Sequence, residues 1–234
     1  MSVAATSELI SGAAPEAVLR WAYESFPRVA IVASFQAESS VLVDMAAGIR
    51  SDIRVITLDT GRLPQETYDM IDRVRDRYAI EVEVVAPDAG DLAEMVGSHG
   101  VNLFYQSPEL RRLCCEVRKS RPLARALHGY DAWVTGVRRQ QAATRAQTPV
   151  VATDPEHGGL TKIAPLASWS KDQVWAYIRE HDLPYHALYE RGFTSIGCAP
   201  CTRATVAGED ERAGRWWWEQ EGEVKECGLH WAAK

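Results

Sequence analysis

A chain of 234 residues that is 46% hydrophobic and 25% charged can bury one substantial core, and its composition is that of an ordinary globular protein. Its 32 acidic and 26 basic side chains leave a net charge of -6, without the basic stripe that a general nucleic-acid-binding protein uses to neutralise phosphates. No segment is long and apolar enough to span a bilayer, and residues 1–12 lack the pattern of a secretory signal. We therefore expect a cytoplasmic protein with neither a nucleic-acid nor a membrane partner.

The order of the predicted elements indicates the fold class. Stretches with helical spacing of apolar residues predict helices, at 15–26, 40–47, 64–78 and 170–181. Short apolar, β-branched runs predict strands, at 29–33, 53–58, 80–85, 132–135 and 161–164. Pro15 suits a first helical turn, and Ser170 is the expected cap of the last helix. This alternation is typical of βαβ units, so we predict an α/β fold with a twisted parallel sheet flanked by helices.

Three polar loops follow predicted strands, with the sequences SFQAESS at 34–40, LDTGR at 58–62 and GVRRQQ at 136–141. Ligands of open parallel sheets bind where the carboxyl ends of the strands meet, so these loops are expected to surround one pocket. The hydroxyls and helix-start amides of the first loop could hold an anion. Each loop alone is weak support, because a serine-rich turn ahead of a helix is more often only a cap.

Basic residues beside these loops and beside the cysteine motifs predict an anionic ligand, although the chain is acidic overall. They are Arg62, Lys119, Arg138, Arg139, Arg145, Arg212 and Arg215. The alternative is that they are ordinary solvated surface residues.

Four of the five cysteines form two pairs, the adjacent Cys114 and Cys115 and a C-x-x-C pair of Cys198 and Cys201. Because cytosolic thiols stay reduced, such pairs indicate a metal centre rather than disulfides. Adjacent cysteines are poorly suited to one tetrahedral zinc ion, whereas an iron–sulfur cluster spreads its thiolate ligands over several irons. A [4Fe-4S] cluster is therefore favoured, with zinc and a metal-free thiol pair as alternatives.

The fifth cysteine, Cys227, stands apart in polar sequence near the C-terminus, where chains are usually exposed. Lys225 and His230 lie close in sequence, and cationic neighbours favour the reactive thiolate. A nucleophile is therefore favoured over a small buried hydrophobic residue.

The sequence changes character beyond Leu183, where glycines and prolines surround the C-x-x-C pair and three tryptophans occupy 216–218. We divide the chain into an α/β nucleotide-binding domain, 1–190, and a cysteine-bearing C-terminal extension, 191–234, within one structural unit. Adjacent indoles cannot share one helical face, so we expect at least one to pack over the core and another to shield the metal centre or a nucleobase.

Seven motifs in order, from about residue 30 to 231, together resemble the assimilatory adenylyl-sulfate (APS) reductases. They are SFQAES at 34–39, LDTGR at 58–62, CCEVRK at 114–119, GVRRQ at 136–140, IGCAPC at 196–201, the segment from GED at 208–210 to Trp218, and ECGLH at 226–230. The paired cysteines and the terminal ECGLH are highly specific to the family. The nucleotide loops are shared with wider relatives.

The resemblance implies an adenine-nucleotide α-hydrolase-like fold and the conversion of APS and reduced thioredoxin, or a similar dithiol protein, to sulfite, AMP and oxidised thioredoxin. It implies that Cys227 is the nucleophile, forming a thiosulfonate, and that Cys114, Cys115, Cys198 and Cys201 hold a [4Fe-4S] cluster. The substrate-binding positions that it implies are Ser34, Phe35, Ser39, Leu58, Gly61, Arg62, Lys119, Gly136, Arg138, Arg212, Arg215 and His230. One position departs from the family pattern, because Gln36 stands where glycine is common, and this argues against a backbone contact with phosphate there.

Three rival interpretations remain. Reductases of the 3'-phosphorylated substrate, PAPS, resemble this chain but lack the four cluster cysteines, which favours APS over PAPS or dual use. ATP pyrophosphatases with a PP-loop usually have glycines at the positions of Phe35 and Gln36. A non-catalytic metal-binding module would leave the nucleotide loops and Cys227 unexplained.

Overall fold

The computed structural model describes residue 10, residues 12–219 and residues 225–226. Its six strands form one sheet in the order β3-β2-β1-β4-β6-β5. The strands are β1 (Val29–Val32), β2 (Arg54–Leu58), β3 (Val82–Val85), β4 (Ala132–Val134), β5 (Val151–Asp154) and β6 (Leu160–Ile163). The main helices are α2 (Pro15–Ser25), α3 (Ala37–Ala47), α4 (Gln65–Tyr78), α5 (Ala89–His99), α6 (Pro108–Cys115), α7 (Arg121–Ala126) and α8 (Lys171–Glu180). The predicted α/β class is confirmed.

The sheet is parallel except at one edge, where β5 pairs antiparallel with β6. Strand β5 was not predicted from the sequence. It joins β6 through a short turn that contains Gly158 and Gly159, both with positive φ. A tight turn suffices to connect antiparallel strands, so no crossover helix marks this strand in the sequence.

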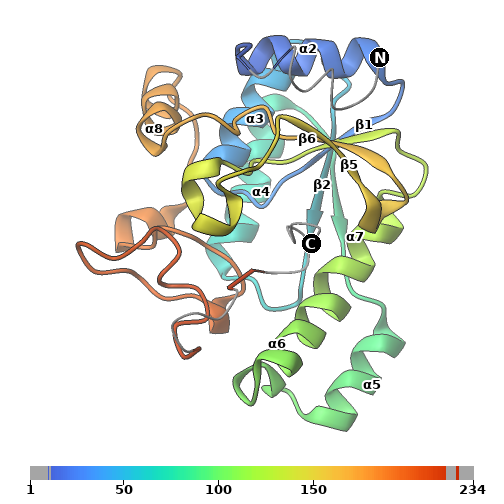
Figure 1. The fold of residues 1–234 in the computed structure, drawn as a ribbon, viewed down its shortest axis with the longest axis vertical. Helices are drawn as coiled ribbons and strands as arrows, with labels where there is room; N and C mark the ends of the chain where they lie inside the picture. The colour runs from blue at the N-terminus through green and yellow to red at the C-terminus, as the bar shows by residue number, and fades with distance from the viewer. Residues whose placement is uncertain (1–9, 11, 220–224, 227–234) are drawn as a thin grey trace.

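Alternate residues of the strands face opposite layers, as the two-residue period of a strand requires. Ile31, Val55 and Val134 lie in the larger apolar cluster, with side chains of α2, α3, α4 and α8. Ala30, Ile56 and Trp133 lie in a second cluster, with residues 123 and 127 at the end of α7. Figure 1 shows the sheet between these two groups of helices. The central strands β1, β2 and β4 are largely buried, which explains why they read as apolar runs, whereas the edge strand β3 is partly exposed.

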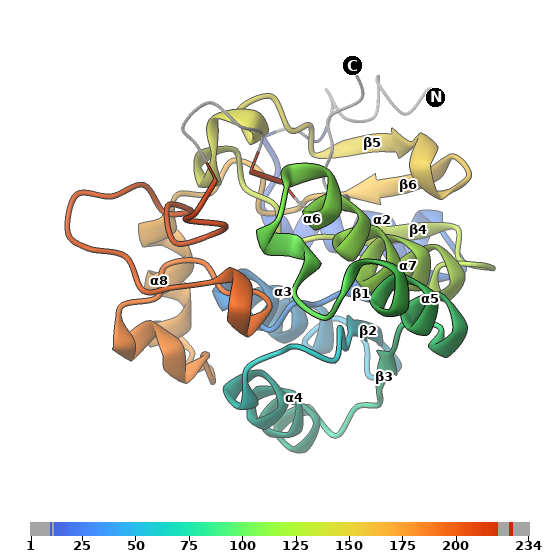
Figure 2. The ribbon, with the colours of Figure 1, turned by 90° about the horizontal axis from the view of Figure 1, so that it is seen from below.

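A third cluster lies away from the sheet, around α5 and α6. It contains the four paired cysteines together with Phe104 and Trp216. Figures 1 and 2 show α5 and α6 beyond the end of α7, with the C-terminal segment, coloured orange to red, near them. Neither helix was predicted from the sequence, and this region therefore brings the tandem cysteines to a position that the βαβ pattern did not indicate.

Local capping follows the sequence at α8. The Ser170 hydroxyl accepts a hydrogen bond from the Gln173 amide, and the Gln173 side chain caps in return, which confirms the predicted cap. The predicted domain boundary between residues 190 and 191 falls inside the short helix η6 (Ala187–Arg191), and the division stays a prediction. Among the residues described, no helix has the length and apolar character that crossing a membrane requires.

His186 gives the stability of the fold a pH dependence. Its ring is fully buried, with Nε2 2.9 Å from the Thr67 hydroxyl and Nδ1 accepting from the Leu188 amide. Burial lowers the pKa of His186, so acidification favours the unfolded chain, which binds the proton more readily. The stabilisation from neutral His186 is present above its unfolded-state pKa of about 6.5 and is lost as the pH falls. Each unit of difference between the folded and unfolded pKa corresponds to about 1.4 kcal/mol in the free energy of unfolding.

We expect the melting temperature of His186→Gln to fall less between pH 7.5 and pH 5.5 than that of the wild type. The measurement is thermal unfolding at both pH values, with His128→Gln, at an exposed position, as the matched control. Equal falls in the wild type and in His186→Gln would contradict the assignment.

Candidate active site

The carboxyl ends of β1, β2 and β4 open into one cavity, as the three polar loops predicted. Seven of the predicted substrate-binding residues line it, namely Ser34, Ser39, Leu58, Lys119, Gly136, Arg212 and Arg215. Four others do not line it, namely Phe35, Gly61, Arg62 and Arg138. Cys227 and His230 lie outside the described residues. Arg145, a basic residue noted in the sequence, also lines the cavity.

The loop between β1 and α3 shapes one wall of this cavity. Phe35 has φ of 54°, in the left-handed region that favours glycine, and its side chain is fully buried in the core. The Ser34 amide donates to the Ser39 hydroxyl at 3.0 Å, which closes the loop on the start of α3. The first turn of α3 therefore faces the cavity, where the positive end of the helix dipole favours an anion.

Gln36 ties this loop to the C-terminal segment. Its Nε2 donates to the Ser34 hydroxyl at 3.2 Å, and its Oε1 accepts from the Ile196 amide at 2.7 Å. Sequence reasoning treated Gln36 only as a departure from glycine and missed this bridge. The signal was present, because an amide side chain can donate and accept at once where glycine can do neither.

Arg138 lies behind the cavity, between two carboxylates. Its Nε donates to Glu38 at 2.7 Å, and its Nη2 donates to both oxygens of Glu211 at 2.9 and 3.1 Å. Burial raises the pKa of Glu211, although the Arg138 charge opposes the rise. Arg138 therefore joins α3 to the C-terminal segment, and its guanidinium supports the wall of the cavity.

The four paired cysteines line a second, smaller cavity. Cys114 and Cys115 end α6, while Cys198 is the N-cap residue of the short helix η7 (Ala199–Cys201) and Cys201 is its last residue. All four are buried and free of disulfides. Within the described part of the chain, no three His, Cys, Asp or Glu side chains are placed to hold a single metal ion. Four buried thiols around one cavity are residues of the kind that could hold a metal centre.

The thiols differ in their electrostatic surroundings. Burial raises the pKa of Cys201 to about 12. Burial acts in the same direction at Cys198, but the charge of Lys119 and the Thr60 hydroxyl, 3.3 Å from the sulfur, outweigh it and lower the pKa of that thiol. The loop after β2 therefore contacts both cavities, because Thr60 lines the strand-end cavity and also lies beside the sulfur of Cys198.

Hydrogen-bond donors surround the thiol cavity. Arg62, Arg118, Lys119, Arg215 and Trp216 all contribute to its wall. Three buried donors there, Arg118 Nε, Arg215 Nε and Trp216 Nε1, have no acceptor among the described atoms. Buried donors are normally satisfied, so an anionic, sulfur-rich group in this cavity fits the residues present. Trp216 lies in the cluster with the thiols and Trp218 packs against that cluster, while Trp217 is exposed.

An irregular helix carries both the tandem cysteines and Lys119. After Cys115 the backbone passes through a π-helical turn, η2 (Glu116–Ser120), before α7 begins. π-helical turns are rare in proteins overall, and those that occur are often found at functional sites. Lys119, in this turn, lines both cavities, as does Arg215 from the C-terminal segment. Two cationic side chains therefore form the partition between the thiols and the cavity at the strand ends.

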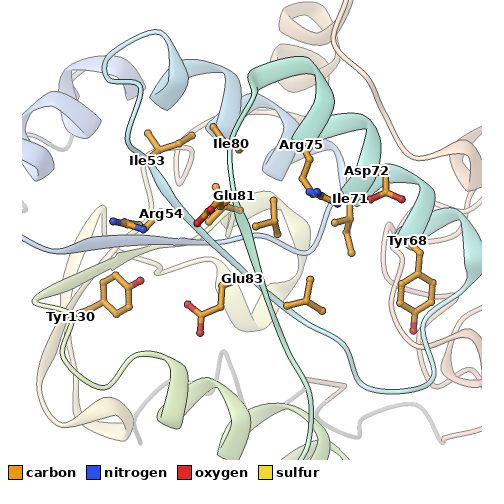
Figure 3. A pocket seen from close by; sticks show the side chains of 13 residues that line it. Ile53, Arg54, Tyr68, Ile71, Asp72, Arg75, Ile80, Glu81, Glu83 and Tyr130 are labelled. Carbon is orange, nitrogen blue, oxygen red and sulfur yellow. Dashed lines mark hydrogen bonds and ion pairs between the residues drawn. The ribbon is translucent and has the colours of Figure 1, made fainter.

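Another hollow, shown in Figure 3, lies at the edge of the sheet between α4 and the strands β2 and β3. Its labelled side chains include Arg75, Glu83 and Tyr130. Of the predicted site residues that the structure describes, none lines it, and none of the four paired cysteines does.

Comparison with known proteins places this arrangement in a family. Residues 28–204 match the family model of the phosphoadenosine phosphosulfate reductase domain. The chain belongs to this family. It is 50% identical over 202 residues to the adenosine 5'-phosphosulfate reductase of Allochromatium vinosum, covering 86% of this chain and 78% of that protein. It is 46% identical over 215 residues to the enzyme of the same name from Burkholderia cepacia, covering 92% and 85%.

Solved structures agree with this placement of the chain in the phosphoadenosine phosphosulfate reductase family. A phosphoadenylyl-sulfate reductase from Candida auris, in a phosphate complex, superposes with a TM-score of 0.73 at 29% identity, covering 87% of this chain and 96% of that one. An FMN adenylyltransferase from Candida glabrata shares the fold, with a TM-score of 0.60 at 14% identity over 97% and 77% of the two chains.

Gly197 makes a testable contribution to the site, because the Arg215 guanidinium lies directly over it. A Cβ at position 197 would stand 2.3 Å from Arg215 Nη2 and 2.5 Å from its Cζ. We expect Gly197→Ala to displace the guanidinium and to weaken APS binding about tenfold or more, since hydrogen bonds to charged groups contribute about 1.5–3 kcal/mol. Calorimetric titration with APS in a Cys227→Ser background measures this.

The matched control is Gly97→Ala in α5, where a Cβ meets open space. It should leave APS affinity unchanged and raise stability by about 0.5–1 kcal/mol. Unaltered APS affinity in Gly197→Ala would show that the position of Arg215 does not matter for the ligand.

Proposed function

We propose that this chain is an adenylyl-sulfate reductase of sulfate assimilation in the cytoplasm, which reduces APS to sulfite and AMP with thiols from thioredoxin or a similar dithiol protein. The observation that carries the proposal is the pairing of a cation-lined cavity at the strand ends with four buried thiols behind Lys119 and Arg215. The names and identities of the bacterial relatives support it.

The residues of the thiol cavity fit a [4Fe-4S] cluster. Cys114, Cys115, Cys198 and Cys201 would hold it, and the orphaned donors of Arg118, Arg215 and Trp216 would face its sulfur atoms. When bound, such a cluster supplies a buried negative charge that holds nearby cations in position. The thiols of the nucleophile and of the dithiol protein carry both electrons of the reduction, so the chemistry below needs none from the cluster.

The strand-end cavity suits a nucleotide with an anionic end. The Ser34 and Ser39 hydroxyls and the first turn of α3 offer donors to phosphate. Lys119, Arg212 and Arg215 bring three positive charges to the same cavity. Charge-assisted hydrogen bonds are the strongest in proteins, so these cations would bind the phosphosulfate and stabilise the charge that develops as it is cleaved.

The reaction then follows from a thiolate at Cys227. Its sulfur attacks the sulfur of the sulfate group, a new S–S bond forms, and the S–O bond to the phosphate breaks as AMP leaves with the electron pair. A thiol of the dithiol protein next attacks the Cys227 sulfur and releases sulfite, which takes the electron pair of the S–S bond. The second thiol of that protein resolves the mixed disulfide and restores the Cys227 thiolate, so the partner is oxidised and the sulfate sulfur is reduced.

Cys227→Ser tests the nucleophile. Mixing the wild type with APS in the absence of reductant should leave a sulfite adduct on Cys227, detected by mass spectrometry, and the serine variant should form none because it has no thiolate to attack sulfur. PAPS in a parallel reaction measures the preference between the two nucleotides. Turnover of APS by Cys227→Ser at the wild-type rate would disprove the assignment.

The thiol centre is tested by metal and sulfide analysis of anaerobically purified protein. We expect about four irons and four sulfides per chain, with the visible absorption of an iron–sulfur cluster. Cys227→Ser should retain this absorption, since Cys227 is not among the four proposed ligands. Stoichiometric zinc without sulfide would refute the cluster.

A further inference from the structure

Glu226, the residue before Cys227, has a buried carboxylate held by residues beside the strand-end cavity. Glu226 is only 2% exposed. Arg145 binds it in a bidentate pair, with Nε 2.8 Å from Oε1 and Nη2 2.7 Å from Oε2. Arg212 Nη2 lies 3.2 Å from Oε2, and the Thr144 hydroxyl donates to Oε1 at 2.9 Å. Both arginines also line the cavity.

The backbone at this point is held as well. Arg212 Nη2 donates to the Lys225 carbonyl at 3.0 Å, and Arg111 Nη1 donates to the Glu226 carbonyl at 2.6 Å. Arg111 itself is fully buried and binds both carboxylate oxygens of Glu219, at 2.7 and 3.1 Å. One guanidinium of α6 therefore holds the chain at residues 219 and 226, on either side of 220–224.

The carboxylate is ionised in this environment. Burial alone would raise the pKa of Glu226, but the hydrogen bond from Arg145 and the charge of Arg212 outweigh burial and hold that pKa below its ordinary value. Burying an ion pair contributes little to stability compared with apolar packing. We therefore explain these contacts by the position in which they hold the Glu226 carboxylate, and not by a gain in the stability of the fold.

We propose that Glu226 is a positioning residue that fixes the attachment point of the nucleophile at the edge of the cavity, an inference that rests on the proposed function. Neighbouring Cα atoms are about 3.8 Å apart, so a Glu226 that is held in place fixes the point from which the chain continues to the next residue. The arginines that line the cavity thus also hold the residue that precedes Cys227 in the chain.

A positioning role for Glu226 and a purely structural role predict different effects of substituting this residue. Glu226 occupies donors of Arg145 and Arg212 on the cavity side of the molecule. Glu226→Gln removes the charge but keeps the size, so it weakens the pair with Arg145 and removes no donor that lines the cavity. Nucleotide affinity should then stay equal or increase, while the attack of Cys227 on sulfur slows.

The experiment uses the anaerobically purified holoprotein with its full chain. Single-turnover formation of the Cys227 sulfite adduct is followed by mass spectrometry at saturating APS, and AMP binding is measured by calorimetry. For Glu226→Gln we expect the adduct rate constant to fall by about tenfold or more, because a displacement of about 1 Å can cost about a hundredfold in rate. We expect the dissociation constant for AMP to change by less than about twofold or to decrease, because no donor to the nucleotide is lost.

Three variants complete the test. Glu226→Asp keeps the charge and should recover part of the rate. Thr144→Val removes one neutral contact outside the cavity lining and should slow adduct formation less than Glu226→Gln does. Glu209→Gln, which removes the carboxylate of a separate ion pair with Arg203, should match the wild type in both measurements.

An unchanged adduct rate constant in Glu226→Gln would overturn the positioning role, and so would a loss of AMP binding that parallels the loss of rate, because that points to a collapsed cavity. If the wild type itself forms no adduct with APS, the proposed function fails, and the positioning role fails with it.

Discussion

The fold depends on buried arginine side chains, whose charges must be paired with acceptors. Five arginines are buried, namely Arg111, Arg118, Arg138, Arg145 and Arg215. A buried charge without partners is costly, so each guanidinium requires an acceptor from somewhere in the fold. Most of these acceptors come from distant parts of the chain. Arg138 brings together Glu38 of α3 and Glu211 of the C-terminal segment, which lie 100 and 73 residues from it. The C-terminal segment is therefore held against the sheet domain by charge as well as by apolar packing.

The same charges organise the two cavities. Lys119 and Arg215 form the partition between the four thiols and the strand ends, so any anion on one side alters the electrostatic environment of the other. Helix α6 extends this coupling, because it carries Cys114 and Cys115 at its end and Arg111 one turn earlier, where Arg111 holds the chain beside Glu226. The four buried thiols, the strand-end cavity and the chain at Glu226 thus share a small set of cations.

The sequence indicates which residues lie at the cavity where the signal is local. Ser34, Ser39 and Leu58 were expected at the cavity because they follow strands whose carboxyl ends meet in any parallel sheet. Phe35 and Arg138 lie in the same loops but do not line the cavity, and their role in substrate binding stays a prediction. Phe35 adopts a left-handed backbone and turns its ring into the core, while Arg138 is drawn behind the wall by Glu38 and Glu211. Which side of a loop faces a ligand depends on these contacts, and adjacency in sequence does not reveal it.

By itself, the sequence determined the α/β class and the pairing of four cysteines apart from a fifth, because hydrophobic period and residue spacing are properties of neighbours along the chain. The tertiary structure alone decided that β5 closes the sheet edge antiparallel, that Gln36 bridges to Ile196, and that Glu226 lies between Arg145 and Arg212. The Gln36 and Arg145 contacts join residues 160 and 81 positions apart. Only the closed fold brings such residues together, since the burial that makes their charges and amides seek partners does not exist until the layers have packed.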